Sequence, residues 1–142
     1  MTKVNFFQKA KEEQVKFAVI AAKYNGKWIF CKHKERSTYE CPGGHREIGE
    51  KIIDTAKREL WEETGATEFS LHPICIYSVI IDDILQNNTE TFGMLYFADV
   101  VEVGELPNLE IERIEFFDKL PTNWTYPDIQ PLLIAQVMKM GF

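Results

Sequence analysis

Apolar residues recur along the chain with two spacings, and the first part of the pattern predicts strands. Val15–Tyr24 and Lys27–His33 are runs rich in β-branched and aromatic residues, and Asn25-Gly26 lies between them. This dipeptide is the strongest short-range signal for a hairpin, because a type I′ turn needs a positive φ at both central positions. A β-hairpin is therefore predicted from Val15 to His33.

The rest of the chain alternates between strand-like and helix-like patterns. A helix is predicted over about Glu50–Thr64, and Gly65 stands where a glycine commonly follows a helix end. Further elements are predicted as strands over Leu71–Ile81, Thr91–Val101 and Ile114–Phe117, a turn or short insertion over Asp82–Asn88, and a terminal helix over Pro127–Met140. Strands interleaved with two helices predict an α/β or α+β fold, with a mixed sheet between helices.

Length and composition are those of one ordinary globular domain. The 142 residues contain no internal repeat or low-complexity linker, so a single domain over residues 1–142 is expected. The three cysteines, Cys31, Cys41 and Cys75, are few and widely spaced, which predicts reduced thiols. No apolar run approaches the roughly 20 residues that span a bilayer, and the polar start lacks a signal-peptide pattern. A cytoplasmic location without a membrane partner is expected.

The net charge of −6 restricts the partners. A protein that coats nucleic acid would show a basic face, so that class is disfavoured. A small phosphorylated substrate stays compatible with an acidic protein if a divalent cation supplies local positive charge.

The predicted helix places carboxylates on its apolar side. On a wheel of about 100° per residue centred on Ala56, Leu60 lies at about +40° and Glu63 at about −20°, inside the apolar stripe. Glu59 and Glu62 lie on the border of that stripe. Like charges at i,i+4 and acidic residues in the last helical turn both destabilise a helix. A divalent cation reverses both effects, and hard oxygen ligands suit Mg²⁺ or Mn²⁺.

A simpler interpretation is that the glutamates are solvated and that Lys57 or Arg58 neutralises them. That interpretation accounts for most acidic helices, but it does not explain Glu63, which lies on the apolar face rather than the solvated one.

Residues 44–66 resemble a Nudix box, which has the pattern G-x5-E-x7-R-E-U-x-E-E-x-G-U with U a bulky aliphatic residue. The matching positions are Gly44, Glu50, Arg58, Glu59, Leu60, Glu62, Glu63 and Gly65, whereas Ala66 is smaller than usual. A match at so many fixed positions is highly specific. The predicted elements around the box also fit the α/β/α sandwich of the Nudix family. The resemblance therefore extends over residues 15–140.

The resemblance implies Mg²⁺-dependent hydrolysis of a nucleoside diphosphate linked to another moiety, with Mn²⁺ as a substitute metal. By analogy with the family, Glu59, Glu62 and Glu63 bind the metal, and a backbone carbonyl near Gly43-Gly44 adds a ligand. Arg58 orients the glutamates through ion pairs with Glu50 or with its helix neighbours. Glu50 and Gly65 have structural roles in the box.

The general base differs among members of the family. It lies either in the box, where Glu59 is the favoured candidate, or in a later loop, where Glu110 and Glu112 precede a predicted strand. A solvated loop is an equally good explanation of the latter pair.

The substrate is less well marked. Some ADP-ribose enzymes have a proline at the sixteenth residue after the box, and dinucleoside polyphosphate enzymes have a tyrosine nearby, but Asp82, Asp83 and Ile84 stand here. Both absences favour a nucleoside triphosphate, cleaved to monophosphate and pyrophosphate. Leu120–Asn123 is similar to a segment of some 8-oxo-dGTP diphosphatases in which an Asn reads the base. Asn123 is therefore a candidate substrate contact, as is Glu47, although Leu120–Asn123 also has the composition of a simple turn.

Three alternatives are kept open. The enzyme could act on a nucleotide sugar or on an RNA 5′ end, or the domain could sense a nucleotide without cleaving it. Because sensor domains commonly lose box glutamates and this chain keeps all of them, the enzyme is the favoured prediction. The expected partner is a small nucleotide, bound by a monomer or a homodimer.

Overall fold

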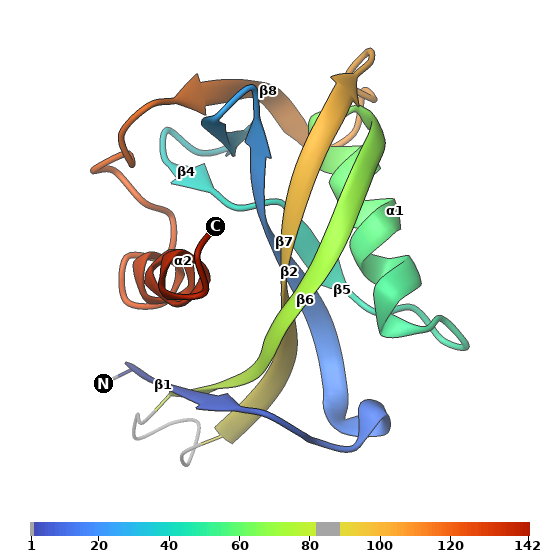
Figure 1. Cartoon of the computed structure of the whole chain (residues 1–142), viewed down its shortest axis with the longest axis vertical. Helices are drawn as coiled ribbons and strands as arrows, with labels where there is room; N and C mark the ends of the chain where they lie inside the picture. Colours follow the sequence, from blue (N-terminus) through green and yellow to red (C-terminus); the bar gives the residue numbers. More distant parts are fainter. Residues whose placement is uncertain (1, 82–88) are drawn as a thin grey trace.

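In the computed structural model, residues 2–81 and 89–142 are described, and they form an eight-stranded mixed sheet between two helices (Figure 1). The main path of the sheet runs β1-β6-β7-β2-β3-β4, with β5 paired to β2 and β8 paired to β3. The strands are β1 (Thr2–Phe7), β2 (Val15–Tyr24), β3 (Lys27–His33), β4 (Tyr39–Glu40), β5 (Gly43–His45), β6 (Ala66–Ile81), β7 (Thr89–Val103) and β8 (Ile111–Phe117). The helices are α1 (Ile52–Thr64) and α2 (Gln130–Lys139), with a short 3₁₀ turn at Glu12–Gln14.

The predicted hairpin is confirmed. β2 and β3 pair antiparallel, and the two turn residues have positive φ, 52° at Asn25 and 78° at Gly26. β2 also pairs with β7, and this pairing is parallel, which makes the sheet mixed. The predicted sandwich is therefore the observed fold class.

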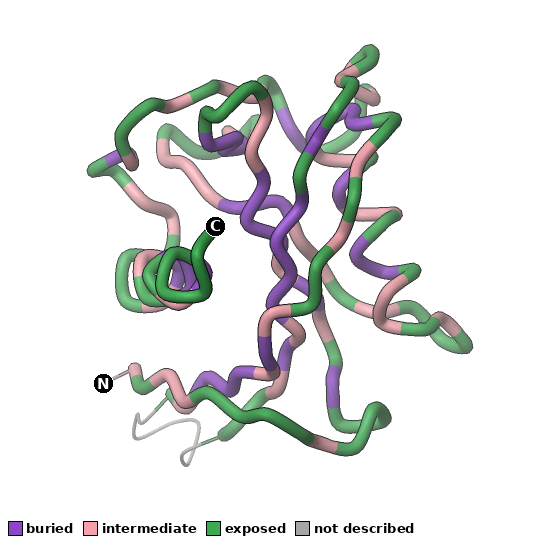
Figure 2. The backbone as a smooth tube through the Cα atoms, viewed as in Figure 1, coloured by how far each residue is buried: buried purple, intermediate pink, exposed green. Residues whose placement is uncertain are grey.

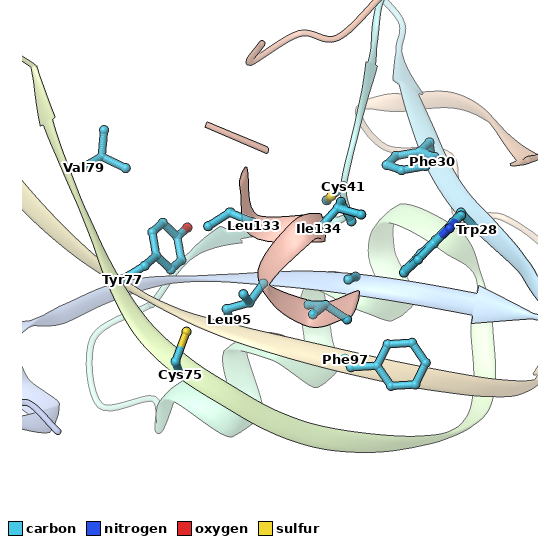
Figure 3. Packing of buried hydrophobic residues seen from close by; sticks show 12 residues of the cluster. Trp28, Phe30, Cys41, Cys75, Tyr77, Val79, Leu95, Phe97, Leu133 and Ile134 are labelled. Atoms are coloured by element: carbon cyan, nitrogen blue, oxygen red, sulfur yellow. The ribbon is translucent and has the colours of Figure 1, made fainter. Parts of the chain in front are cut away.

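Each face of the sheet has its own apolar cluster, and burial is concentrated where the central strands meet the helices (Figure 2). On one face, Leu133 and Ile134 of α2 pack in a cluster with Tyr77 and Leu95 of the sheet (Figure 3). On the other face, Ala56 and Leu60 of α1 pack with buried residues of β2 and β7. The three cysteines are free, as expected, and they are buried.

Several element boundaries differ from the predicted ones. α2 begins at Gln130 rather than Pro127, because the Tyr126 carbonyl first closes a turn by accepting the N–H groups of Ile129 and Gln130. Pro131 instead occupies the first turn of α2. β6 begins five residues before the predicted Leu71. Its long pairing with β7 has a register shift next to Pro73, which lets the strand include a proline. The turn predicted over Asp82–Asn88 lies outside the described residues.

Three strands were not predicted. β1 was missed because the first 14 residues are polar on average, and its pairing partner, β6, is far away in sequence. β4 and β5 are two and three residues long, and β5 contains two glycines, which are typical of loops.

Candidate active site

The last two turns of α1 carry Glu59, Glu62 and Glu63, called here the box glutamates. Gly65 fixes where the helix ends. Gly65 adopts the left-handed conformation with φ 78°, and its N–H donates to the Trp61 carbonyl at 2.8 Å. A Cβ at this position would also lie 2.9 Å from the Glu105 carbonyl oxygen. The Gly65 carbonyl in turn accepts the N–H of Gly104 at 2.8 Å. The helix end is thus tied to the start of the loop between β7 and β8.

Glu63 is the most enclosed of the box carboxylates. Its Oε1 accepts the N–H of Gly43 at 2.8 Å. Burial raises the pKa of the Glu63 carboxyl to about 8, and the nearby charge of Glu59 adds to the increase. Without a cation, this carboxyl therefore favours the protonated form near neutral pH.

Glu59 lies against Gly44. A Cβ built on Gly44 would overlap the carboxylate of Glu59, and one built on Gly43 would overlap the Ala18 carbonyl oxygen. The glycine pair thus lets β5 approach both β2 and α1, which brings its backbone beside the box glutamates. Burial also raises the pKa of Glu59.

Arg58 connects the box residues. Its guanidinium donates to both oxygens of Glu50, at 2.8 and 3.0 Å, to Glu59 at 2.7 Å and to Glu62 at 3.3 Å. It also donates to the His45 carbonyl at 3.0 Å. Arg58 therefore contacts both sets of partners that the resemblance implied, Glu50 and its helix neighbours.

Glu50 is the fixed end of this network. Besides the Arg58 guanidinium, its carboxylate accepts the Thr55 hydroxyl at 2.6 Å and the Glu47 N–H at 3.1 Å. The hydrogen bond from Arg58 is the main reason why the pKa of Glu50 is lowered to about 2. Glu50 thus anchors Arg58 from outside the helix.

A pocket of about 240 Å³ unites the box glutamates with the later loop. Its described lining residues are Glu59, Glu62, Glu63, Leu109, Glu110 and Ile111. The four carboxylates supply only hard oxygen donors, and this donor set fits a divalent cation such as Mg²⁺ or Mn²⁺.

The carboxylates are not yet arranged as a closed ligand cage. Within residues 2–81 and 89–142, no three His, Cys, Asp or Glu side chains converge closely enough to hold a metal ion. Glu59 and Glu62 face Arg58 instead, and Glu63 faces the Gly43 N–H. We therefore expect a cation to draw Glu59 and Glu62 partly away from Arg58.

The two later acidic candidates, Glu110 and Glu112, have different surroundings. Glu110 lines the pocket, and its side chain is 79% exposed. Glu112 is paired with Lys32 at 3.1 Å and with Arg113 at 2.6 Å, and it is not among the lining residues. Of the two, the structure brings only Glu110 to the box glutamates.

The two candidate substrate contacts lie apart from this pocket. Glu47 lines a second, open depression of about 490 Å³, together with Lys16 and Arg46 among others, and lies 3.8 Å from Arg58. Asn123 is exposed, and its amide nitrogen donates to the Ser37 carbonyl at 3.1 Å. Neither residue is among those lining the glutamate pocket.

His33 is a neighbour of the pocket that the sequence did not single out. It comes at the end of β3, and its Nε2 lies 3.9 Å from Oε2 of Glu110. The two residues are far apart in sequence, so only the pairing of β3 with β8 reveals the contact.

The sequence of this chain is similar to those of known proteins. The NUDIX domain family model matches residues 13–130. The "Putative 8-oxo-dGTP diphosphatase YtkD" of Bacillus subtilis (strain 168) is 30% identical over 122 residues, which cover 84% of this chain and 73% of YtkD. Phosphatase NudJ of Escherichia coli (strain K12) is 35% identical over 68 residues, 48% of this chain and 39% of NudJ.

Solved structures support the same fold. The Bacillus subtilis pyrophosphohydrolase BsRppH superposes with a TM-score of 0.81 and 24% sequence identity, covering 99% of this chain and 92% of that one. None of the helices in the described part of the chain is long and apolar enough to cross a membrane. With the box glutamates gathered at one pocket and the family model matching most of the chain, this protein belongs to the NUDIX family and is a pyrophosphohydrolase of the Nudix type.

Proposed function

We propose that this enzyme hydrolyses a nucleoside triphosphate, with 8-oxo-dGTP as the leading candidate, to the monophosphate and pyrophosphate in the presence of Mg²⁺. The observation that carries the proposal is the pocket in which Glu110 joins Glu59, Glu62 and Glu63. The name of YtkD, which describes an 8-oxo-dGTP diphosphatase, supports the choice of substrate.

In this proposal Glu59, Glu62 and Glu63 hold the cation, and the Gly44 carbonyl completes the protein ligands. When bound, the cation neutralises phosphate oxygens and favours ionisation of the attacking water. Arg58 keeps Glu59 and Glu62 on the pocket side of α1, and Glu50 anchors Arg58 from outside the helix.

Glu110 is the better proton acceptor in this pocket, in contrast to the expectation that favoured Glu59. The Glu59 carboxylate is held at 2.7 Å by the Arg58 guanidinium and is one of the proposed metal ligands, so it is not free to approach the attacking water. Glu110 is largely exposed and lines the same pocket. It accepts a proton from water while the water oxygen bonds to phosphorus, and the bond from that phosphorus to the bridging oxygen breaks. Pyrophosphate leaves with the electron pair of that bond.

A panel of substrates tests the proposal directly. The purified protein is incubated with 8-oxo-dGTP, dGTP, dATP, dCTP, nucleotide sugars and 5′-triphosphorylated RNA, each with Mg²⁺, with Mn²⁺ and with excess EDTA. Release of pyrophosphate and a monophosphate from a triphosphate, abolished by EDTA, is the expected result. Preferential turnover of a nucleotide sugar or of the RNA end would replace the triphosphate as substrate, and full activity in EDTA would overturn the metal requirement.

One matched pair of variants tests the pocket. Glu63→Gln removes a ligand charge without emptying space, and it is expected to lower turnover by at least about 10²-fold. Glu68→Gln changes an exposed carboxylate of β6 and serves as the control, with unchanged turnover. Near-normal turnover of Glu63→Gln would show that Glu63 is structural.

A further inference from the structure

We infer that His33 is a positioning residue that aims the carboxylate of Glu110 at the reacting water. The inference rests on the proposed function, in which Glu110 is the proton acceptor. Its basis is the place of His33 at the end of β3, beside the loop that carries Glu110.

The backbone of Glu110 is held by residues at and just beyond the end of β3. His33 pairs with Ile111 in the antiparallel β3–β8 ladder, and the N–H of Lys34 donates to the Glu110 carbonyl at 3.0 Å. The Lys34 amine also donates to the side-chain oxygen of Asn108 at 2.8 Å. Because these bonds hold the main chain of the loop, the remaining freedom at Glu110 is in its side chain.

The His33 ring is held with a defined nitrogen facing Glu110. Its Nδ1 accepts the N–H of Glu35 at 3.1 Å, so the neutral ring carries its proton on Nε2. Nε2 lies 3.9 Å from Oε2 of Glu110. The His33 side chain is only 18% exposed, whereas that of Glu110 is 79% exposed. A fixed donor thus faces a carboxylate that is free to move, and contacts of this kind shorten when substrate binds.

The other charges beside His33 are engaged elsewhere. The Lys32 amine pairs with Glu112 at 3.1 Å and donates to the carbonyl of His33, not to its ring. Glu112 is held further by Arg113. The ring of His33 is therefore the group that the β3 end offers to the Glu110 carboxylate.

Two substitutions separate the two contacts of the ring. A glutamine amide reaches about as far as Nε2, so His33→Gln keeps a donor for Glu110 but loses the acceptor for the Glu35 N–H. An asparagine side chain reaches only as far as Nδ1, so His33→Asn keeps the acceptor for the Glu35 N–H but loses the donor for Glu110. A positioning role and a purely structural role therefore predict opposite orders of activity.

The expected result is that His33→Gln retains kcat within about threefold, whereas His33→Asn lowers kcat about tenfold with little change in KM. Thermal melting is measured alongside, and the Tm of His33→Asn is expected to be the closer of the two to that of the wild type. His72→Gln, at an exposed position of β6, is the control and keeps wild-type kcat. Any other order of kcat for the two His33 variants overturns the inference.

A double-mutant cycle with Glu110→Gln separates this inference from the proposed function. Glu110→Gln alone is expected to lower kcat by about 10²-fold or more, and adding His33→Asn is expected to cause no further loss. A further tenfold loss in the double variant would show that His33 does not act through Glu110. Wild-type kcat for Glu110→Gln alone would overturn Glu110 as the proton acceptor, and the inference would fall for that reason instead.

Discussion

The carboxylate of Glu59 occupies the volume beside the Cα of Gly44 that a side chain at residue 44 would need. The φ of Gly44 is not in the left-handed region, so the glycine is required for space rather than for backbone conformation. A strand residue of the box loop and a helix residue of the box are thus in direct contact.

Gly44→Ala is expected to displace the Glu59 carboxylate, because the added methyl group overlaps it. The displaced atoms are the end of a flexible side chain, so we expect a small change in Tm but a loss of roughly 10²-fold in kcat/KM. The measurement is steady-state kinetics with parallel thermal melting. Gly26→Ala is the matched control: φ is 78° and its surroundings are open, so it strains a turn and lowers Tm without changing kcat/KM. Unchanged kinetics of Gly44→Ala would contradict a role for this contact.

Cation binding is expected to release protons near neutral pH. The pKa of Glu63 is raised to about 8, from 4.5 in an unfolded chain. The protonated carboxyl therefore stabilises the metal-free fold, fully below pH 4.5 and less as the pH rises through about 8. A cation requires the ionised form, so at pH 7 its binding displaces the proton.

Titration calorimetry with Mg²⁺ at pH 7, in two buffers of different ionisation enthalpy, measures this release. About one proton is expected from Glu63 in the wild-type protein, and Glu63→Gln should lose that contribution. Equal heats in the two buffers for the wild-type protein would rule the release out.

Glu50 is expected to contribute an acid-sensitive part of the stability. Its pKa is lowered to about 2 in the folded protein, so its contribution is present above its unfolded pKa of 4.5 and is lost as the pH falls through about 2. Glu50→Gln removes the charge that Arg58 binds and should destabilise the fold by about 1–2 kcal/mol at pH 7. Urea unfolding at pH 7 and at pH 2 measures the difference, which should nearly disappear at the lower pH. A difference that is the same at both pH values would mean that the ion pair contributes nothing.

Replacing Asn123 tests whether this residue makes the enzyme prefer one nucleotide base over another. Its amide nitrogen donates to the Ser37 carbonyl, which leaves its Oδ1 to accept a hydrogen bond from a base. If the proposed base contact holds, Asn123→Ala should lower kcat/KM for the preferred purine roughly tenfold and leave dCTP turnover nearly unchanged. An equal fall for all substrates, or no fall at all, would mean that Asn123 only closes the turn against Ser37.

The sequence predicted best what depends on local patterns. Asn25-Gly26 specifies a hairpin by its own turn geometry, and Gly65 marks a helix end because few other residues tolerate its φ. β5 was not predicted, because Gly43 and Gly44 have low strand propensity and are in the sheet to allow close approach to Ala18 and Glu59. β1 was missed for a related reason: its pairing with β6 is non-local, and its own composition is polar.

The site residues, too, were predicted where they depend on local spacing and were missed or left undecided where they depend on strand pairing. Regular helical spacing brings Glu59, Glu62 and Glu63 together, so the sequence alone could group them. The choice between Glu110 and Glu112 depends on strand pairing, because these two glutamates, one residue apart, differ in which side chains of β3 lie beside them. His33 had no sequence signal, since its contact exists only through the β3–β8 ladder.

The hydrogen bond from Gly104 to Gly65 closes the end of the long β6–β7 ribbon that lies beside α1. β6 starts at Ala66, beside the end of α1, and the antiparallel β7 returns to the same place, where Val103 pairs with Ala66. The spacing between the box glutamates and the Glu110 loop is therefore set at this end of the ribbon, by the pairing of Ala66 with Val103 and by the Gly104–Gly65 hydrogen bond. For protein engineering, residues 104–110 are therefore a poor place to graft a tag or a reporter domain, because an insertion there would change that spacing.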